Sequence, residues 1–122
     1  MKVENIKFKA KNTLDGTWVQ GDLIHKEDGK IAILRNGFNV SEVDPSTVCQ
    51  FTGLKDCEGN EIWEGDIIRN PEFPFEKRAV TWSNNSSCFM PIDEDGCQDR
   101  SFSFLVLFKK WTVVGNKFDK EK

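Results

Sequence analysis

No stretch of the sequence approaches the ~18 consecutive apolar residues that a membrane-spanning helix needs. Residues 1–7 also lack the continuous apolar core of a secretory signal peptide. These two absences argue against a helical membrane protein and favour a soluble protein of the cytoplasm. We therefore expect no membrane partner.

The spacing of a structural zinc site is absent too. The four cysteines, Cys49, Cys57, Cys88 and Cys97, form no Cys-x-x-Cys pair, although such pairs are typical of these sites. The sequence contains neither a Gly-x-x-x-x-Gly-Lys phosphate loop nor a Gly-x-Gly-x-x-Gly fingerprint. We expect reduced thiols, no metal site and no cofactor. The alternative is a four-cysteine metal site formed by converging turns.

Histidine is nearly absent, since His25 is the only one. A Cys–His nucleophilic pair would need one of the cysteines to meet His25 in space, whereas a surface histidine needs nothing further. The densest acidic cluster begins at Asp93 and includes Asp99, but its Gly96 comes too early for an EF-hand loop. We expect a solvated turn there and no enzyme activity.

A basic excess is also missing, because 17 basic and 20 acidic residues give a net charge of -3. General binders of nucleic acid normally carry such an excess. The one candidate strip consists of Lys7, Lys9 and Lys11 with Phe8 between them. In a regular strand Phe8 points away from these lysines. Solubilising an edge strand therefore explains the lysines at least as well as nucleic-acid binding does.

Aromatic and apolar residues are plentiful enough for a core. Of the 122 residues, 38% are apolar, and they include ten Phe and four Trp, whose side chains bury large areas. The length fits one domain, or a compact domain with a small sheet appended. We expect a folded chain with an aromatic-rich core.

Alternation with a period of two predicts the first strand. Ile6, Phe8 and Ala10 alternate with lysines, which indicates a strand with one buried face and a wet face formed by the lysines. Glycine turns then follow at short intervals. A two-residue turn is expected at Asp15-Gly16 and further turns at Asp28-Gly29 and Asn36-Gly37, and the strands between and after them are residues 17–24, 30–35 and 38–40.

These hairpins predict an antiparallel meander over residues 1–45, with a glycine bulge at Gly21. The polar residues 41–46 include the first proline and indicate the boundary with a second part, residues 46–117. A mobile tail is expected at residues 118–122. Residues 98–108 fit a helix or irregular structure better than a strand. Further strands are expected at residues 47–51, 66–69, 79–82, 87–92 and 111–114.

The central stretch, residues 51–68, combines glycine turns with acidic residues. Gly53, Gly59 and Gly65 predict three sharp changes of chain direction, because glycine adopts positive φ without a steric cost. Two interpretations follow. The glycines hold the shape of the backbone, or Asp56, Glu64 and Asp66 form an acidic site; we favour shape, because glycine and aspartate are the usual turn residues.

The same stretch resembles the signature of the YopX family of prophage and phage-associated small proteins. It has the aromatic-Thr-Gly-Leu-Lys-Asp opening, the Gly-Asn turn and the aromatic-Glu-Gly-Asp-Ile-Ile close, and residues 5–10 and 111–118 are similar to the family's ends. The sequence departs from the family at Cys57 and at residues 119–122. The candidate binding residues that the resemblance implies are Phe51, Gly53, Leu54, Asp56, Gly59, Trp63, Glu64, Gly65 and Asp66.

The resemblance further implies a mostly β protein with an SH3-like barrel and at most one or two short helices. It implies a homo-oligomer with no established biochemical activity. We expect a non-enzymatic protein-interaction module, with a phage or host protein as a further partner. A nucleic-acid-binding accessory factor in phage DNA metabolism or regulation is the alternative.

Overall fold

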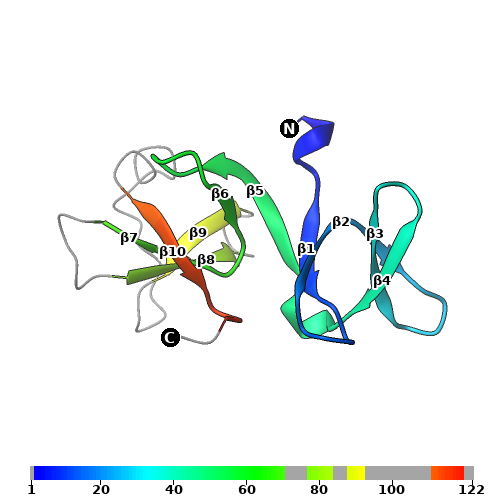
Figure 1. The fold of residues 1–122 in the computed structure, drawn as a ribbon. Helices are drawn as coiled ribbons and strands as arrows, with labels where there is room; N and C mark the ends of the chain where they lie inside the picture. Colours follow the sequence, from blue (N-terminus) through cyan, green and yellow to red (C-terminus); the bar gives the residue numbers. More distant parts are fainter. Residues whose placement is uncertain (1, 71–76, 84–87, 93–110, 120–122) are drawn as a thin grey trace. The chain divides into compact units, whose positions relative to one another are not determined.

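A computed structural model of the protein describes residues 2–70, 77–83, 88–92 and 111–119 (Figure 1). The only helices in this part of the chain are two 3-10 turns, η1 (Val3–Asn5) and η2 (Pro45–Thr47). The strand pairs are antiparallel, which confirms the predicted mostly β fold class. Within the described ranges no closed barrel is found, and no helix there is long and apolar enough to cross a membrane.

The chain divides into two compact units, Met1–Phe51 and Thr52–Lys122. The first contains β1 (Phe8–Lys11), β2 (Trp18–His25), β3 (Ile31–Arg35), β4 (Asn39–Val43) and the beginning of β5 (Cys49–Lys55). The second contains the rest of β5, β6 (Glu61–Trp63), β7 (Asp66–Arg69), β8 (Lys77–Ser83), β9 (Cys88–Ile92) and β10 (Thr112–Asn116). Residues 98–108, for which we expect helical or irregular structure, lie outside the described ranges.

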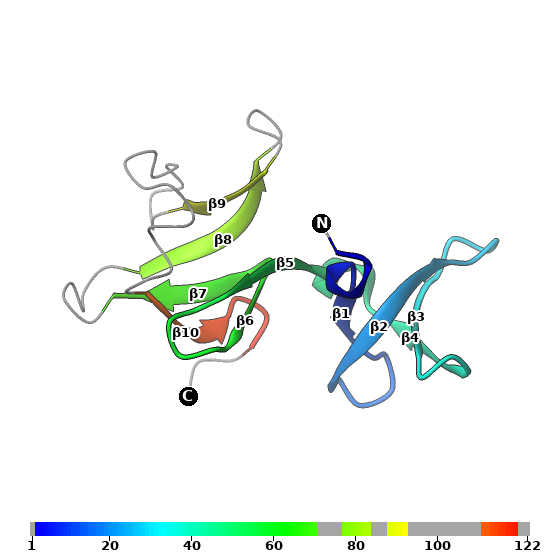
Figure 2. The ribbon, with the colours of Figure 1, turned by 90° about the horizontal axis from the view of Figure 1, so that it is seen from above.

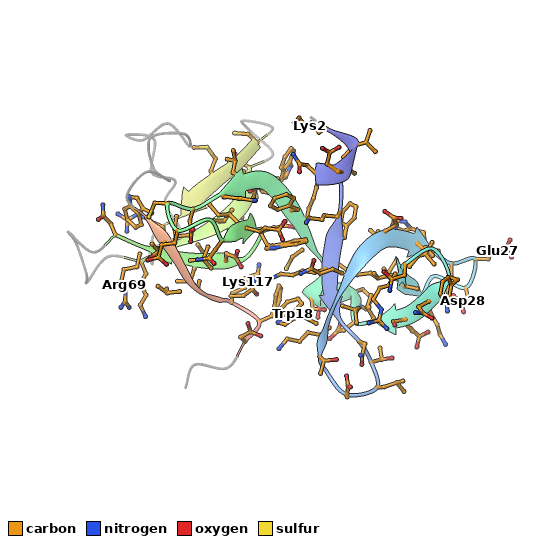
Figure 3. The ribbon with its side chains drawn as sticks, turned by 45° about the horizontal axis from the view of Figure 1, so that its top comes forward. Lys2, Trp18, Glu27, Asp28, Arg69 and Lys117 are labelled. Carbon is orange, nitrogen blue, oxygen red and sulfur yellow. The ribbon has the colours of Figure 1, made fainter. Side chains whose placement is uncertain are left out.

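Two of the predicted hairpin turns are confirmed in the first unit. At Asp28-Gly29 the Lys26 N–H donates to the Lys30 carbonyl (2.9 Å) and Gly29 has a φ of 86°; Figure 3 shows Asp28 at this turn. Asn36 and Gly37 have φ values of 55° and 80°. Both turns use residues that tolerate positive φ, which is why local sequence was sufficient to locate them.

The turn at Asp15-Gly16 is longer than predicted. The Asn12 N–H donates to the Thr17 carbonyl (2.9 Å), which encloses residues 13–16. The Asn12 side-chain oxygen accepts from the N–H groups of Leu14 (3.0 Å) and Asp15 (2.9 Å). These side-chain hydrogen bonds replace the strand ladder, so the two-residue turn is wrong and a wider loop forms.

Gly21 marks the point at which β2 changes partner. Phe8 of β1 pairs with Gly21, and the following Asp22 pairs with Leu34 of β3. A Cβ built on Gly21 would lie 2.0 Å from the Leu34 carbonyl oxygen and 2.9 Å from its carbon. Glycine is therefore required here for close backbone approach, a common role of glycine within strands.

The first unit has a small core formed by Ala10, Val19, Ile33 and Val43. Ala10 is fully buried, as the alternation predicts, but Ile6 is 48% exposed. Ile6 follows η1 and precedes β1, so the strand begins two residues later than expected. The alternation in sequence therefore extends beyond the paired part of the strand.

The second unit packs around Ile62, Ile68, Val80 and Trp111. Its four-stranded sheet has the order β10-β7-β8-β9, which can be followed in Figure 2. The predicted pairing of residues 79–82 with 87–92 is confirmed by β8 and β9. The final strand is longer than predicted, because β10 continues to Asn116, whose side chain is buried.

Candidate functional site

The Asp56 carboxylate organises the hairpin between β5 and β6. Its Oδ1 accepts from the N–H groups of Glu58 (2.9 Å) and Asn60 (2.8 Å), and its Oδ2 accepts from the Asn60 side chain (3.1 Å). Gly59, with a φ of 86°, completes the turn. The expected reversal at Gly59 is confirmed, and both carboxylate oxygens of Asp56 accept hydrogen bonds within this turn.

Asp56 also holds a strand distant in sequence, because the Val113 N–H of β10 donates to its Oδ2 (3.0 Å). Burial by itself raises the pKa of the Asp56 carboxyl. The hydrogen bonds from the Val113 and Asn60 backbone, the Asn60 side chain and the Glu58 backbone outweigh burial and hold the pKa below 3.8, because they stabilise the charged form.

Asp66 plays the same part at the next turn. Its Oδ2 accepts from the Trp63 N–H (2.7 Å) and its Oδ1 from the Asn116 side-chain amide (3.0 Å). Asp66 is 2% exposed and Asn116 is 6% exposed. A buried carboxylate is stable only when its oxygens are hydrogen-bonded, so Asp66 fixes the turn and the end of β10 together.

Gly65 completes this arrangement through its backbone. Its N–H donates to the Val80 carbonyl (2.7 Å), and its carbonyl accepts from the Lys117 N–H (2.9 Å). Its φ of 85° places the turn between β6 and β7 in the region that glycine favours. The chain therefore changes direction at Gly65 as expected.

Gly53 does not reverse the chain, which corrects the third predicted reversal. Its φ is 83°, yet β5 continues through it from Cys49 to Lys55. One residue of positive φ bends a strand, whereas a reversal also needs a hydrogen bond that closes the turn, as at Gly59. All three glycines thus hold backbone shape, but in different ways.

The remaining signature residues are mostly turned inward. Phe51 and Trp63 are buried, and Leu54 packs against the core of the second unit. Glu64 is half-buried, and its backbone carbonyl accepts from the Asn116 amide (3.4 Å). Asp56, Glu64 and Asp66 therefore lie along one hydrogen-bonded frame, in which the two aspartates are turn acceptors.

The lysine row is arranged differently from the prediction. Lys7, Lys9 and Lys11 are half-buried rather than fully wet. The Lys7 Nζ lies 4.7 Å from the centre of the Phe51 ring, while the Nζ atoms of Lys9 and Lys11 lie 4.7 and 5.3 Å from the centre of the Trp18 ring. The aromatic partners are on neighbouring strands, so Phe8 is not one of them.

Cross-strand register explains these pairs. Lys11 is opposite Trp18 in the pairing of β1 with β2, and the Phe51 N–H donates to the Lys7 carbonyl (3.0 Å). Side chains of directly opposed residues share one face of a sheet. Figure 3 shows Trp18 at the start of β2. Phe51 is 2% exposed, so Trp18 is the more accessible ring.

Sequence reasoning missed two residues that complete these arrangements. Asn116 ties the end of β10 to Asp66, and its only sequence signal is the Gly-Asn pair in the stretch similar to the family's close. Trp18 gave no signal as a partner of lysine, because the contact depends on how β1 and β2 align. In the described ranges no group of three His, Cys, Asp or Glu is placed to hold a metal ion.

Several large apolar side chains lie on the surface of the described part of the chain. Leu14 is 96% exposed, Phe38 79% and Val40 53%. Trp82 is 43% exposed and packs edge-on against Phe89, with ring centres 5.1 Å apart. Exposed apolar side chains that lie close together mark contact surfaces more often than isolated ones do, and Phe38 and Val40 are two residues apart.

Comparison with known proteins places the signature within a family. The family model described as YopX protein matches residues 3–121, which is nearly the whole chain. The match confirms the resemblance carried by residues 51–68. No curated protein matches the chain.

Proposed function

We propose that this chain, which belongs to the YopX family, is a phage-derived, non-enzymatic protein-interaction module that self-associates. The observation that carries the proposal is the exposure of Phe38 and Val40, both large apolar residues on one hairpin. Burying apolar area is the main driving force of protein association. A phage or host protein is the other partner class for the same surfaces.

The signature residues support this proposal because they hold the strands of the second unit together. Asp56 and Asp66 accept hydrogen bonds from turns and from β10, so their chemistry serves the fold of the second unit. We further propose that this unit belongs to an SH3-like barrel, which is consistent with its antiparallel strands and shared core. A cytoplasmic location is part of the proposal.

Sedimentation velocity across a wide range of protein concentration tests self-association. We expect the weight-average mass to rise above that of one chain as concentration increases, because a small apolar surface gives concentration-dependent assembly. A mass that stays at one chain over the whole range would contradict the proposal. A repeat at high salt separates apolar from charge-driven assembly, because only the latter weakens.

Nucleic-acid binding is the second candidate function, and one observation favours it. The lysine row shares its face with Trp18, and single-strand binders combine lysine charge with stacking aromatic rings. Fluorescence anisotropy with single- and double-stranded oligonucleotides at low salt tests it. Glutamine at Lys7, Lys9 and Lys11 is expected to abolish binding, while glutamine at the exposed Lys2, Lys26 and Lys55 preserves it. Equal loss in both variants would reduce the effect to net charge.

A further inference from the structure

The outer edge of β4 is partly covered by the chain itself. β4 is the last strand in its sheet, yet the Thr13 N–H donates to the Glu42 carbonyl (3.0 Å) and the Asp44 N–H to the Lys11 carbonyl (2.9 Å). An isolated bridge joins Asn12 to Val43. Among the residues that the structure describes, the C-terminal half of this edge is therefore already paired, and the N-terminal half is the open part.

The backbone N–H and C=O of Val40 point away from β3, toward the outer edge of the sheet. The Glu42 carbonyl is on the outer side of β4, since it accepts from the Thr13 N–H, which lies on the side away from β3. In an antiparallel ladder the N–H and C=O of one residue point to the same side, and alternate residues repeat that direction. Val40, two residues earlier, therefore presents both its donor and its acceptor outward. Within the described residues, neither group has a hydrogen bond on that side.

This open edge lacks the usual protection against pairing. Natural edges carry lysine, proline or inward-pointing charge, whereas residues 36–41 contain no charged residue and no proline in a chain that is 30% charged. Phe38 and Val40 expose apolar side chains here. A second copy can therefore approach this stretch without repulsion between like charges.

We infer that β4 pairs with β4 of a second copy of this chain about a two-fold axis at Val40. The Val40 N–H of each copy then donates to the Val40 carbonyl of the other. Asn39 stands opposite Ser41 on both sides of the axis, so polar residues face polar residues. Pairing ends at Glu42, because Thr13 occupies its outer side. A two-fold contact of this kind is self-complementary.

The inference rests on the proposed self-association and gives it a location. A pairing of residues 39–41 is small, so the contact is expected to be weak and dependent on concentration. A charged peptide or an extended segment of another protein is a less suitable occupant, because the open edge is short and uncharged. Pairing with such a segment instead would leave Val40 of the two copies apart.

Val40→Pro tests the outward N–H. Proline removes one donor from each copy and places its ring against the partner, but it removes no bond to β3, because the Val40 N–H points away from that strand. We expect association to weaken at least ten-fold in sedimentation velocity. Val40→Thr is the matched control, since it keeps the N–H and the β-branched shape, and its association is expected to stay near that of the native chain.

Cysteine cross-linking tests the register and does not depend on how well Val40→Pro folds. In a background with serine at Cys57, Cys88 and Cys97, Val40→Cys is expected to form a disulfide between copies, because opposed Cα atoms lie about 5.5 Å apart. Asn39→Cys alone is expected not to, whereas a mixture of Asn39→Cys and Ser41→Cys proteins is. Association that survives Val40→Pro without Val40→Cys cross-linking would overturn this contact and leave self-association intact. A native chain that stays monomeric would overturn both.

Discussion

Alanine at Gly21 is expected to lower the free energy of unfolding by about 3 kcal/mol or more, because overpacking against backbone cannot relax by a rotamer change. The added Cβ would lie 2.0 Å from the Leu34 carbonyl oxygen. Relief requires β2 and β3 to separate where β2 passes from one partner to the other. Urea unfolding followed by circular dichroism measures the loss, and hydrogen exchange assigns it to the first unit.

Gly29→Ala is the matched control in the same pair of strands. Gly29 has a φ of 86°, but nothing lies within 4 Å of the position that its Cβ would occupy. The substitution adds only the strain of positive φ, which costs roughly 1 kcal/mol. Equal losses for the two variants would show that backbone conformation, rather than the contact with Leu34, makes Gly21 necessary.

Features of the fold that depend on neighbouring residues could be predicted from the sequence more completely than features that depend on distant ones. The turns at Asp28-Gly29 and Asn36-Gly37 could be predicted because their φ values depend on the residues themselves. The turn near Gly16 was wrong in length because the Asn12 side chain competes with the ladder. Turn residues thus locate a hairpin more reliably than they give its loop length.

Contacts between strands were harder to predict. The alternation of Lys7, Lys9 and Lys11 showed that they share a face, but their rings come from Trp18 and Phe51 on other strands. Only the register of β1 with its neighbours brings these residues together. The lysine row could therefore be predicted from the sequence alone, but the aromatic rings that it contacts could not.

The signature shows a similar limit. Gly59, Gly65 and the aspartates correctly indicated turns, but nothing in residues 51–68 reveals that Asp56 and Asp66 also bind β10, some fifty residues later in the chain. Long-range hydrogen bonds of this kind depend on the packing of the second unit around Ile62 and Trp111. The structural role of the candidate binding residues could therefore be recognised only from the position of β10, the strand that they hold.

Alanine at Asp56 is expected to lower the free energy of unfolding by about 3 kcal/mol, because hydrogen bonds to a charged acceptor contribute more than neutral ones. The substitution leaves the N–H groups of Glu58, Asn60 and Val113 without their acceptor. The loss is expected to concentrate in the second unit, with exchange protection reduced at β10. Asp28→Ala is the control, because the exposed Asp28 accepts, from the described part of the chain, only the local Lys30 N–H (2.9 Å).

Asparagine at Asp56 isolates the contribution of its charge through the dependence of stability on pH. Its hydrogen bonds hold the folded pKa of the Asp56 carboxyl below its usual range, so the stabilisation that this carboxylate provides is fully present above the unfolded pKa of about 3.9 and is lost as pH falls through the folded pKa. The difference in unfolding free energy between the native chain and Asp56→Asn should therefore be constant near neutral pH and shrink in acid. Other carboxylates titrate in both proteins, and their contributions cancel in that difference. A difference that stays constant down to pH about 2 would show that the Asp56 hydrogen bonds do not depend on its ionisation.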